Sequence, residues 1–184
     1  MVAKITIPKS IEAALNYNEK KVQKGNAVCL HAANYLNEAK DMNFYQKLNG
    51  FERLNSLNDR ATTKTLHVSL NFDPSEKIAD DKLLKIAELY MNKIGFGEQP
   101  FIIYKHENAG HPYIHIVSTV IKEDGSRINT HNIGRNQSKK SKKGNRTTIW
   151  FNKSRTAAAP LANGWCIYCH TQASLNLSVY LGHL

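Results

Sequence analysis

The chain has 184 residues, a formal net charge of +10 and three cysteines. This length is sufficient for one domain with a hydrophobic core, and the odd cysteine count argues against a disulfide framework. The sequence contains no run of 18 apolar residues and no N-terminal apolar segment of the secretory kind, which argues against a membrane span and against export. We therefore expect a cytoplasmic protein.

The positive charge is unevenly distributed along the chain. Residues 1–138 contain 18 Lys and Arg against 15 Asp and Glu, whereas residues 139–184 contain 7 basic residues and no acidic one. A basic protein suggests a nucleic-acid partner, but most of the excess lies outside the first segment. We predict a folded domain over residues 1–138 and a basic tail over residues 139–184.

The N-terminal segment predicts a strand followed by a helix. Residues 4–7 alternate and stop at Pro8, and Ser10 can cap a helix that begins at Ile11. One stripe of this helix consists of Ile11, Leu15, Asn18 and Val22. Tyr17 lies away from that stripe and should reach solvent. An exposed tyrosine can be a contact residue or can simply pack on its own helix, and the pattern leaves both interpretations open.

The middle of the chain predicts two helices separated by a strand. Residues 26–60 are mixed and rich in Asn, with helical spacing over residues 44–57 that Gly50 weakens. Residues 65–72 alternate as in a central strand, with His67 and Ser69 as possible contact residues on the face opposite the core. Asp80 can cap a helix that runs to Ile94, with Gly95 as the stop signal after it.

Two short apolar runs with three histidines follow. Residues 101–104 and 114–117 predict two buried strands joined by a polar link. His106 ends the first strand, and His111 and His115 share a face if the second strand extends back through Pro112. Converging imidazoles form divalent-metal sites, whereas a single His on a strand is usually a hydrogen-bonded structural residue.

These elements predict an α+β fold. We expect a mainly antiparallel sheet, with the histidine-bearing strands at its centre and helices packed on one face. Residues 122–127 contain an Asp-Gly turn, and Ile128 begins a return strand.

The histidine segment resembles the third motif of plasmid and transposon relaxases, the mobilisation nucleases of the HUH endonuclease superfamily. The matching residues are His106, the loop Glu107-Asn108-Ala109-Gly110 and His111-Pro112-Tyr113-Ile114-His115. The resemblance covers roughly residues 1–138 and is closest to relaxases of mobilisable elements in anaerobic gut bacteria. It implies a Mg²⁺ or Mn²⁺ ion held by His106 and His115.

The motif departs from the family pattern at two positions. Tyr113 stands where the family usually has a ligand histidine, and Asn108 stands where an aspartate is common. A neutral phenol is a poor ligand for Mg²⁺ or Mn²⁺. His111 or a water molecule would then supply the third ligand.

The resemblance also implies a nucleophile. Relaxases use an N-terminal tyrosine, and their local pattern is similar to Ala14-Leu15-Asn16-Tyr17 followed by a Lys-rich turn. This assigns Tyr17 as the nucleophile, with Tyr35 and Tyr45 as alternatives. Attack on a DNA phosphate would leave a 5′-phosphotyrosyl link and a free 3′-hydroxyl.

Several polar residues are candidate contacts around this site. DNA-binding candidates are Lys20, Lys21, Lys24, Ser69, Arg127 and Arg135. The lysines follow Tyr17 and can bind phosphates, although lysines spaced in this way are also common on a solvated helix face. Glu76 and Glu107 are candidate acceptors for the outer N–H of a ligand histidine. The implied partners are single-stranded or duplex DNA at a transfer origin and accessory mobilisation proteins.

The tail differs in composition from the domain. Relaxases continue at this point with a Lys/Glu-rich helix that leads to Phe-Gly-Leu. When the codons of Trp150-Phe151 are read in a frame shifted by one base, they give the glycine of that Phe-Gly-Leu. We expect a frameshift near residues 137–143, a truncated relaxase and a disordered basic tail. The Cys-x-x-Cys-His pattern at 166–170 matches haem attachment, but with no export signal we predict no haem and no zinc site there.

Four functions remain open on the sequence alone. The first is a metal-dependent relaxase that nicks one DNA strand at a transfer origin. This hypothesis includes a relaxase that truncation has inactivated. The others are a DNA-binding remnant that does not cut, a rolling-circle replication initiator or transposase of the same superfamily, and a metal hydrolase acting on small molecules.

Overall fold

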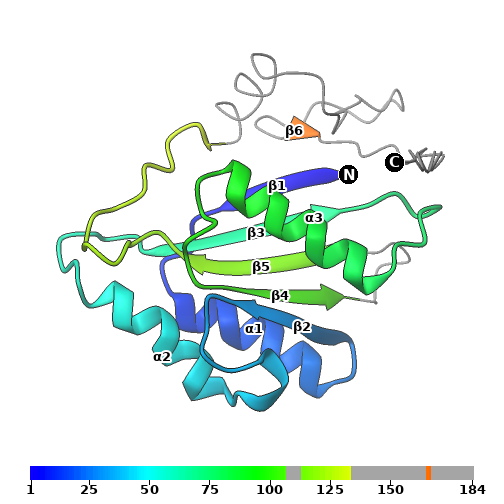
Figure 1. Ribbon diagram of the computed structural model, residues 1–184, viewed down its shortest axis with the longest axis horizontal. Helices are drawn as coiled ribbons and strands as arrows, with labels where there is room; N and C mark the ends of the chain where they lie inside the picture. Colours follow the sequence, from blue (N-terminus) through cyan, green and yellow to red (C-terminus); the bar gives the residue numbers. More distant parts are fainter. Residues whose placement is uncertain (107–112, 134–164, 167–184) are drawn as a thin grey trace, which may run out of the picture.

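The computed structural model describes residues 1–106 and 113–133, together with the backbone of 165–166. Its centre is a sheet with the strand order β2-β4-β5-β3-β1-β6, in which every pairing is antiparallel (Figure 1). The strands are β1 (Val2–Thr6), β2 (Ala27–Ala33), β3 (Thr65–Asn71), β4 (Phe101–His106), β5 (Tyr113–Thr119) and β6 (Trp165–Cys166). The histidine-bearing strands β4 and β5 are therefore interior neighbours, as the sequence predicts.

Within the described residues, three helices and one 3₁₀ turn accompany the sheet. They are α1 (Ile11–Gln23), η1 (Ala39–Asp41), α2 (Phe44–Asn55) and α3 (Asp80–Lys93). Ser10 caps α1, because its hydroxyl accepts a hydrogen bond of 3.1 Å from the backbone N–H of Ala13. Asn43 and Gln46 form a capping box at the start of α2. These side chains fix where each helix begins.

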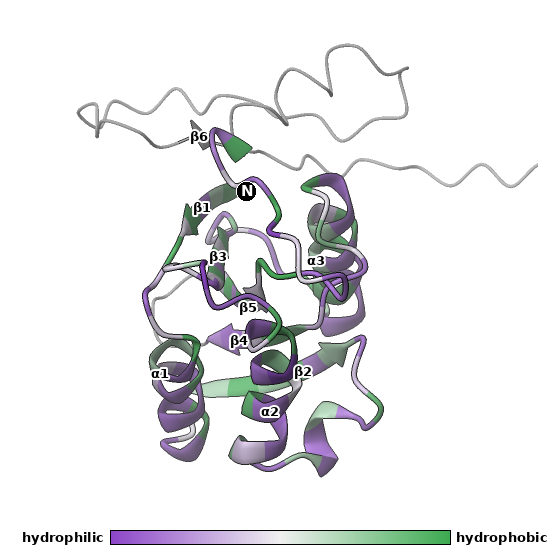
Figure 2. Cartoon of the chain, turned by 90° about the vertical axis from the view of Figure 1, so that its left-hand side faces the viewer, coloured by the Kyte–Doolittle hydropathy of each residue, from purple (hydrophilic) through white to green (hydrophobic). Residues whose placement is uncertain are grey.

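The helices cover both faces of the sheet, rather than the single face expected from the sequence. Figure 2 shows α1 and α3 on opposite sides of the strands. One core lies on the α3 side and includes Leu66, Val68, Leu70, Ile114 and Ile116. The other lies under α1 and α2 and includes Leu15, Phe51, Ile102, Tyr104 and Val117. The prediction was wrong because strand alternation assigns one apolar face and cannot show that the polar-looking face is also covered.

Three further details differ from the expectations. Strand β2 lies in the segment treated as mixed, since Ala-Val-Cys-Leu-His-Ala-Ala does not alternate clearly. Asp80 is the first residue of α3 and Ala79 occupies the cap position. After the turn at residues 122–127, only an isolated bridge joins Ile121 to Arg127, so no return strand forms in the part described.

The two-residue strand β6 comes from the segment expected to be disordered. Its backbone pairs Cys166 with Val2 and Trp165 with Ala3, antiparallel to β1. The remaining residues expected in the tail, and the Cys-x-x-Cys-His pattern as a whole, lie outside the described residues. Within the described ranges, none of the helices has the length and apolar character needed to cross a bilayer.

Candidate active site

Three imidazoles gather on the sheet face that α1 covers. The register pairs His115 with Tyr104 of β4 and with Ser69 of β3, which brings the side chains of three strands together. The ring centroids of His106 and His115 lie 4.2 Å apart, and those of His67 and His115 lie 4.7 Å apart. The predicted convergence of His106 and His115 therefore occurs, and His67 joins them from β3.

Asn18 connects this cluster to α1. Its side chain is completely buried, and its Oδ1 lies 2.8 Å from Nε2 of His106 and 3.1 Å from Nδ1 of His115. The Nδ2 of the same amide donates to the backbone oxygen of Ala14 at 2.8 Å. One side chain of α1 thus contacts both histidine-bearing strands.

The histidines are held in their neutral form. Burial, together with the smaller effects of the Lys21 and His67 charges, lowers the pKa of His106 to about 4. Burial likewise lowers the pKa of His115 to about 3, with smaller effects from His67, His106 and Lys21. The pKa of His67 is lowered by burial and by Lys4. Neutral imidazoles keep a lone pair available for a metal at neutral pH.

Tyr17 lies directly beside the imidazole cluster. Its ring stacks on those of His106 and His115, with centroid distances of 6.4 and 6.1 Å, and about half of the side chain is exposed. The alternative tyrosines are placed differently. The hydroxyl of Tyr35 donates to the backbone oxygen of Lys47 at 2.8 Å, and Tyr45 is exposed with its ring against Phe44. Of the three N-terminal candidates, Tyr17 is the one that the structure brings to the histidines.

Lys21 and Tyr113 complete the immediate surroundings of Tyr17. The Nζ of Lys21 lies 5.0 Å from the centroid of the Tyr17 ring. Hydrogen bonding to the Tyr17 side chain raises the pKa of Lys21, and Tyr113 raises it further against the opposing effect of burial. Tyr113 stacks on His106, with 4.9 Å between the ring centroids and 16° between the planes. A phenol therefore occupies the position where the resemblance expects a ligand imidazole.

The other predicted site residues are more scattered. Lys20 on α1 and Lys24 at its C-cap are exposed, and Ser69 accepts a hydrogen bond of 3.2 Å from Asn71 on the histidine face of β3. Arg127 is held at the start of β3, where its Nε donates to the backbone oxygen of Thr63 at 3.3 Å.

Glu76 lies in the turn after β3, where its backbone N–H donates to the oxygen of Asp73. The remaining predicted residues, Glu107, His111 and Arg135, lie outside the described residues.

Sequence reasoning gave no site role to Asn18, and treated His67 only as a possible contact. The helical wheel already placed Asn18 on the buried stripe, and a polar residue there signals a buried partner. The alternation of β3 already placed His67 on the face opposite the core. Neither pattern could show that these two residues meet histidines that lie 48 to 97 residues away along the chain.

The histidine cluster fits part of a divalent-metal site. Besides the neutral imidazoles, Nδ1 of the buried His106 has no hydrogen-bond partner among the described residues. Within that same part of the chain, no three His, Cys, Asp or Glu side chains already form a coordination set. His106 and His115 are thus suitable ligands, and the third predicted ligand, His111, lies outside the described residues.

A buried ion pair supports α1 behind the site. The Nζ of Lys47 donates to Oε1 of Glu19 at 2.7 Å, and the hydroxyl of Tyr104 donates to the same oxygen. Their side chains are largely buried, with relative exposures of 5% for Lys47 and 14% for Glu19. Because Tyr104 pairs with His115 across the sheet, this network anchors the helix that carries Tyr17 to the histidine-bearing strands.

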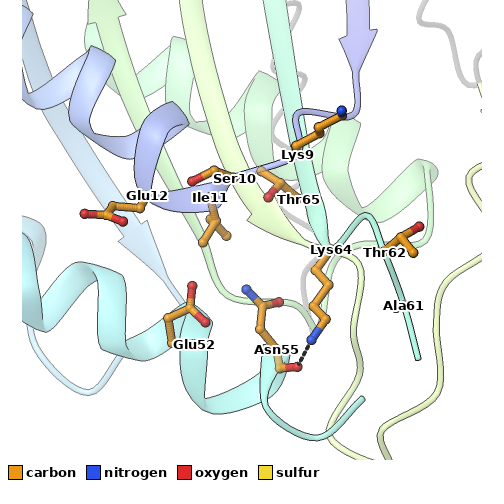
Figure 3. A pocket seen from close by; sticks show the side chains of 10 residues that line it. All are labelled: Lys9, Ser10, Ile11, Glu12, Glu52, Asn55, Ala61, Thr62, Lys64 and Thr65. Carbon is orange, nitrogen blue, oxygen red and sulfur yellow. Dashed lines mark hydrogen bonds between the residues drawn. The ribbon is translucent and has the colours of Figure 1, made fainter. Parts of the chain in front are cut away.

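A separate pocket of about 260 Å³ opens near the start of α1 (Figure 3). It is lined by Lys9, Ser10, Ile11, Glu12, Glu52, Asn55, Ala61, Thr62, Lys64 and Thr65. Inside it, Nζ of Lys64 donates to the backbone oxygen of Asn55 at 2.8 Å, so one of its two lysines already has a partner. The histidine cluster does not contribute to this lining.

Comparison with known families agrees with this geometry. The model of the MobA/VirD2-like relaxase nuclease domain matches residues 17–146 of the chain. The match begins at Tyr17 and includes every histidine of the cluster. A search of curated proteins found no match.

Proposed function

Because this chain belongs to the MobA/VirD2-like relaxases, we propose that it nicks one strand of DNA at a plasmid or transposon transfer origin through Tyr17. The observation that carries this proposal is the stacking of the half-exposed Tyr17 ring on the rings of His106 and His115. A nucleophile must reach its phosphate, and a half-exposed phenol beside a buried imidazole cluster can do so.

The proposed step conserves the energy of the phosphodiester bond. The Tyr17 oxygen forms a bond to phosphorus as the bond to the 3′-oxygen breaks, and the 3′-oxygen takes up a proton in place of the one that Tyr17 loses. The products are a 5′-phosphotyrosyl protein and a free 3′-hydroxyl, which can rejoin by the reverse reaction. Lys21 lies close enough to Tyr17 to stabilise negative charge on the phenol oxygen.

A divalent ion, Mg²⁺ or Mn²⁺, would be held by His106 and His115 with His111. When bound, such an ion supplies a positive charge that polarises the phosphate. Asn18 and Tyr113 orient the ligand imidazoles through the contacts described above. The DNA contacts would come from Lys20, Lys24 and Ser69, with Arg127 and Arg135 further away along the chain. The proposal includes accessory mobilisation proteins as partners and a cytoplasmic location.

The test is the formation of a covalent protein–DNA adduct. Single-stranded oligonucleotides that tile the DNA flanking the gene, labelled at the 3′ end, are incubated with the full chain and Mg²⁺ or Mn²⁺. We expect one of them to yield a labelled adduct that survives denaturing electrophoresis. Tyr17→Phe should abolish the adduct, whereas the matched variant Tyr45→Phe should retain it. An adduct that persists in Tyr17→Phe would overturn the assignment.

Tyr113 favours a second candidate, a remnant that binds DNA without cutting it. A phenol in place of a ligand imidazole weakens any metal site built on His106 and His115. DNA binding by the wild-type chain with no adduct under any of these metal conditions would support this second function.

A further inference from the structure

Asn18 is a polar residue in a fully buried position of α1. It shares the buried stripe of the helix with Ile11 and Leu15, and none of its side chain is exposed. A buried amide costs free energy unless its donors and acceptor find partners. The partners of Asn18 therefore explain why an amide is tolerated there.

The orientation of this amide is fixed by its own helix. Nδ2 can only donate, and it lies 2.8 Å from the backbone oxygen of Ala14, which can only accept. The other end of the amide, Oδ1, then faces the sheet. Oδ1 is an acceptor with two lone pairs, so each ring nitrogen that approaches it must carry a hydrogen.

In the part of the chain that the structure describes, two ring nitrogens approach Oδ1. They are Nε2 of His106 at 2.8 Å and Nδ1 of His115 at 3.1 Å. We infer that Asn18 is a positioning residue, whose single amide oxygen fixes opposite tautomers of the two histidines: Nε2–H in His106 and Nδ1–H in His115.

The consequence is a defined pair of lone pairs. A neutral imidazole carries one N–H, so the free lone pair of His106 is at Nδ1 and that of His115 is at Nε2. Nδ1 of His106 is indeed buried and without a hydrogen-bond partner in the part of the chain that the structure describes. An acceptor behind a ligand histidine commonly orients it in this way and raises its basicity. Asn18 would thus decide which nitrogen of each ring keeps the lone pair that a ligand can use, and its neighbour Tyr17 is carried on the same turn of α1.

This inference rests on the proposed function, but the tautomers can be measured whether or not the protein nicks DNA. Long-range ¹H–¹⁵N spectra of the metal-free, DNA-free chain, labelled at histidine nitrogens, report which ring nitrogen bears hydrogen. Signals are assigned by their loss in His106→Gln and His115→Gln. We expect Nε2–H for His106 and Nδ1–H for His115, although free histidine prefers Nε2–H. A wild-type spectrum with Nε2–H at His115 would overturn the inference.

Two variants, each with a leucine in place of an asparagine of similar side-chain size, extend the test. Asn18→Leu removes the acceptor, and Asn16→Leu makes the same change at a half-buried position of the same helix. Asn18→Leu should release the Nδ1–H preference of His115 and weaken Mn²⁺ binding by about 10- to 100-fold in a titration without DNA. Asn16→Leu should change neither. Unchanged tautomers in a folded Asn18→Leu variant would contradict the inference; if that variant does not fold, the wild-type spectrum still decides. Absence of a DNA adduct would count against the nicking proposal alone.

Discussion

The ammonium group of Lys21 lies 5.0 Å from the centre of the Tyr17 ring, one helical turn further along α1. In the proposed reaction, a positive charge at this position would stabilise the negative charge that develops on the phenol oxygen as its proton leaves. We predict that Lys21→Met slows adduct formation about tenfold, which corresponds to about 1.4 kcal/mol of lost stabilisation in the transition state. The rate is measured in single-turnover reactions with saturating oligonucleotide.

The matched control for this prediction is Lys24→Met. Lys24 is exposed at the end of the same helix, and it should affect DNA affinity through phosphate contact but leave the saturated rate unchanged. Equal effects of the two substitutions on the saturated rate would mean that Lys21 is only a DNA contact.

Tyr113 provides a gain-of-function test of the proposed metal site. Its ring stacks on His106 from the strand position beside His115, so an imidazole there would meet the same cluster. Tyr113→His should tighten Mn²⁺ binding, because the new imidazole adds a bond to the ion. Each 1.4 kcal/mol that this bond contributes lowers the dissociation constant about tenfold. Calorimetric titration of the DNA-free chain measures this. Tyr113→Phe keeps the ring and should show no gain; equal affinities for the His and Phe variants would argue that the cluster does not hold the ion.

The buried pair of Lys47 and Glu19 predicts a large loss of stability when it is broken. Lys47→Met leaves the Glu19 carboxylate largely buried with Tyr104 as its remaining partner in the network. Breaking such pairs typically costs about 3 to 5 kcal/mol in free energy of unfolding. Urea denaturation followed by circular dichroism measures the cost. Lys40→Met breaks the exposed pair with Glu38 and should have no measurable effect, so a similar loss in both variants would refute the argument.

Periodicity predicted most of the fold, because the apolar residues that form the core also carry the pattern. The alternation of Leu66, Val68 and Leu70 and the helical stripe of Leu83, Ala87 and Met91 correspond to buried residues in the structure. Strand β2 was missed because it is an outer strand of mixed character, with Val28 exposed and Ala32 buried. Its place is set by pairing with β4 rather than by its own pattern.

The site was predicted only as far as the motif reaches. The proximity of His106, His115 and Tyr17 could be predicted because the resemblance assigns all three to one site. His67 and Asn18 depend on β3 and α1 packing against β5, which is a tertiary arrangement that no local pattern contains. The sequence signal for Asn18 was its place among apolar residues on the helical stripe. The reason for an amide there becomes clear only when the structure shows the two imidazole rings that it contacts.

Cys29 predicts a specific dependence of thiol reactivity on pH. Burial raises the pKa of its thiol to about 11, with opposing effects of the nearby Lys47 charge. Only the thiolate reacts with alkylating agents, and a raised pKa leaves about one thiol in a thousand ionised at pH 8. Iodoacetamide labelling followed by mass spectrometry should therefore be far slower at Cys29 than in the urea-unfolded chain, and should accelerate toward pH 11. Equal rates in the folded and unfolded chains would contradict this.

Gly50 lies within α2, where its lack of a side chain makes room for Tyr35. A Cβ at this position would lie 2.8 Å from Cζ of Tyr35 and closer still to Cε1, while the Tyr35 hydroxyl is held by the backbone oxygen of Lys47. Alanine favours a helix interior over glycine by about 1 kcal/mol. Gly50→Ala should nevertheless destabilise the chain by about 1 to 3 kcal/mol, because the ring cannot move without losing its hydrogen bond and its contact with Phe51.

A double-mutant cycle with Tyr35→Leu separates the two effects on stability. In the Tyr35→Leu background the ring is gone, so Gly50→Ala should become neutral or stabilising in urea denaturation. The difference between the effects of Gly50→Ala on the free energy of unfolding in the two backgrounds then measures the steric clash between the methyl group added at Gly50 and the Tyr35 ring. A Gly50→Ala variant that is more stable than wild type would show that the Tyr35 ring can yield, and that helix propensity alone decides this position.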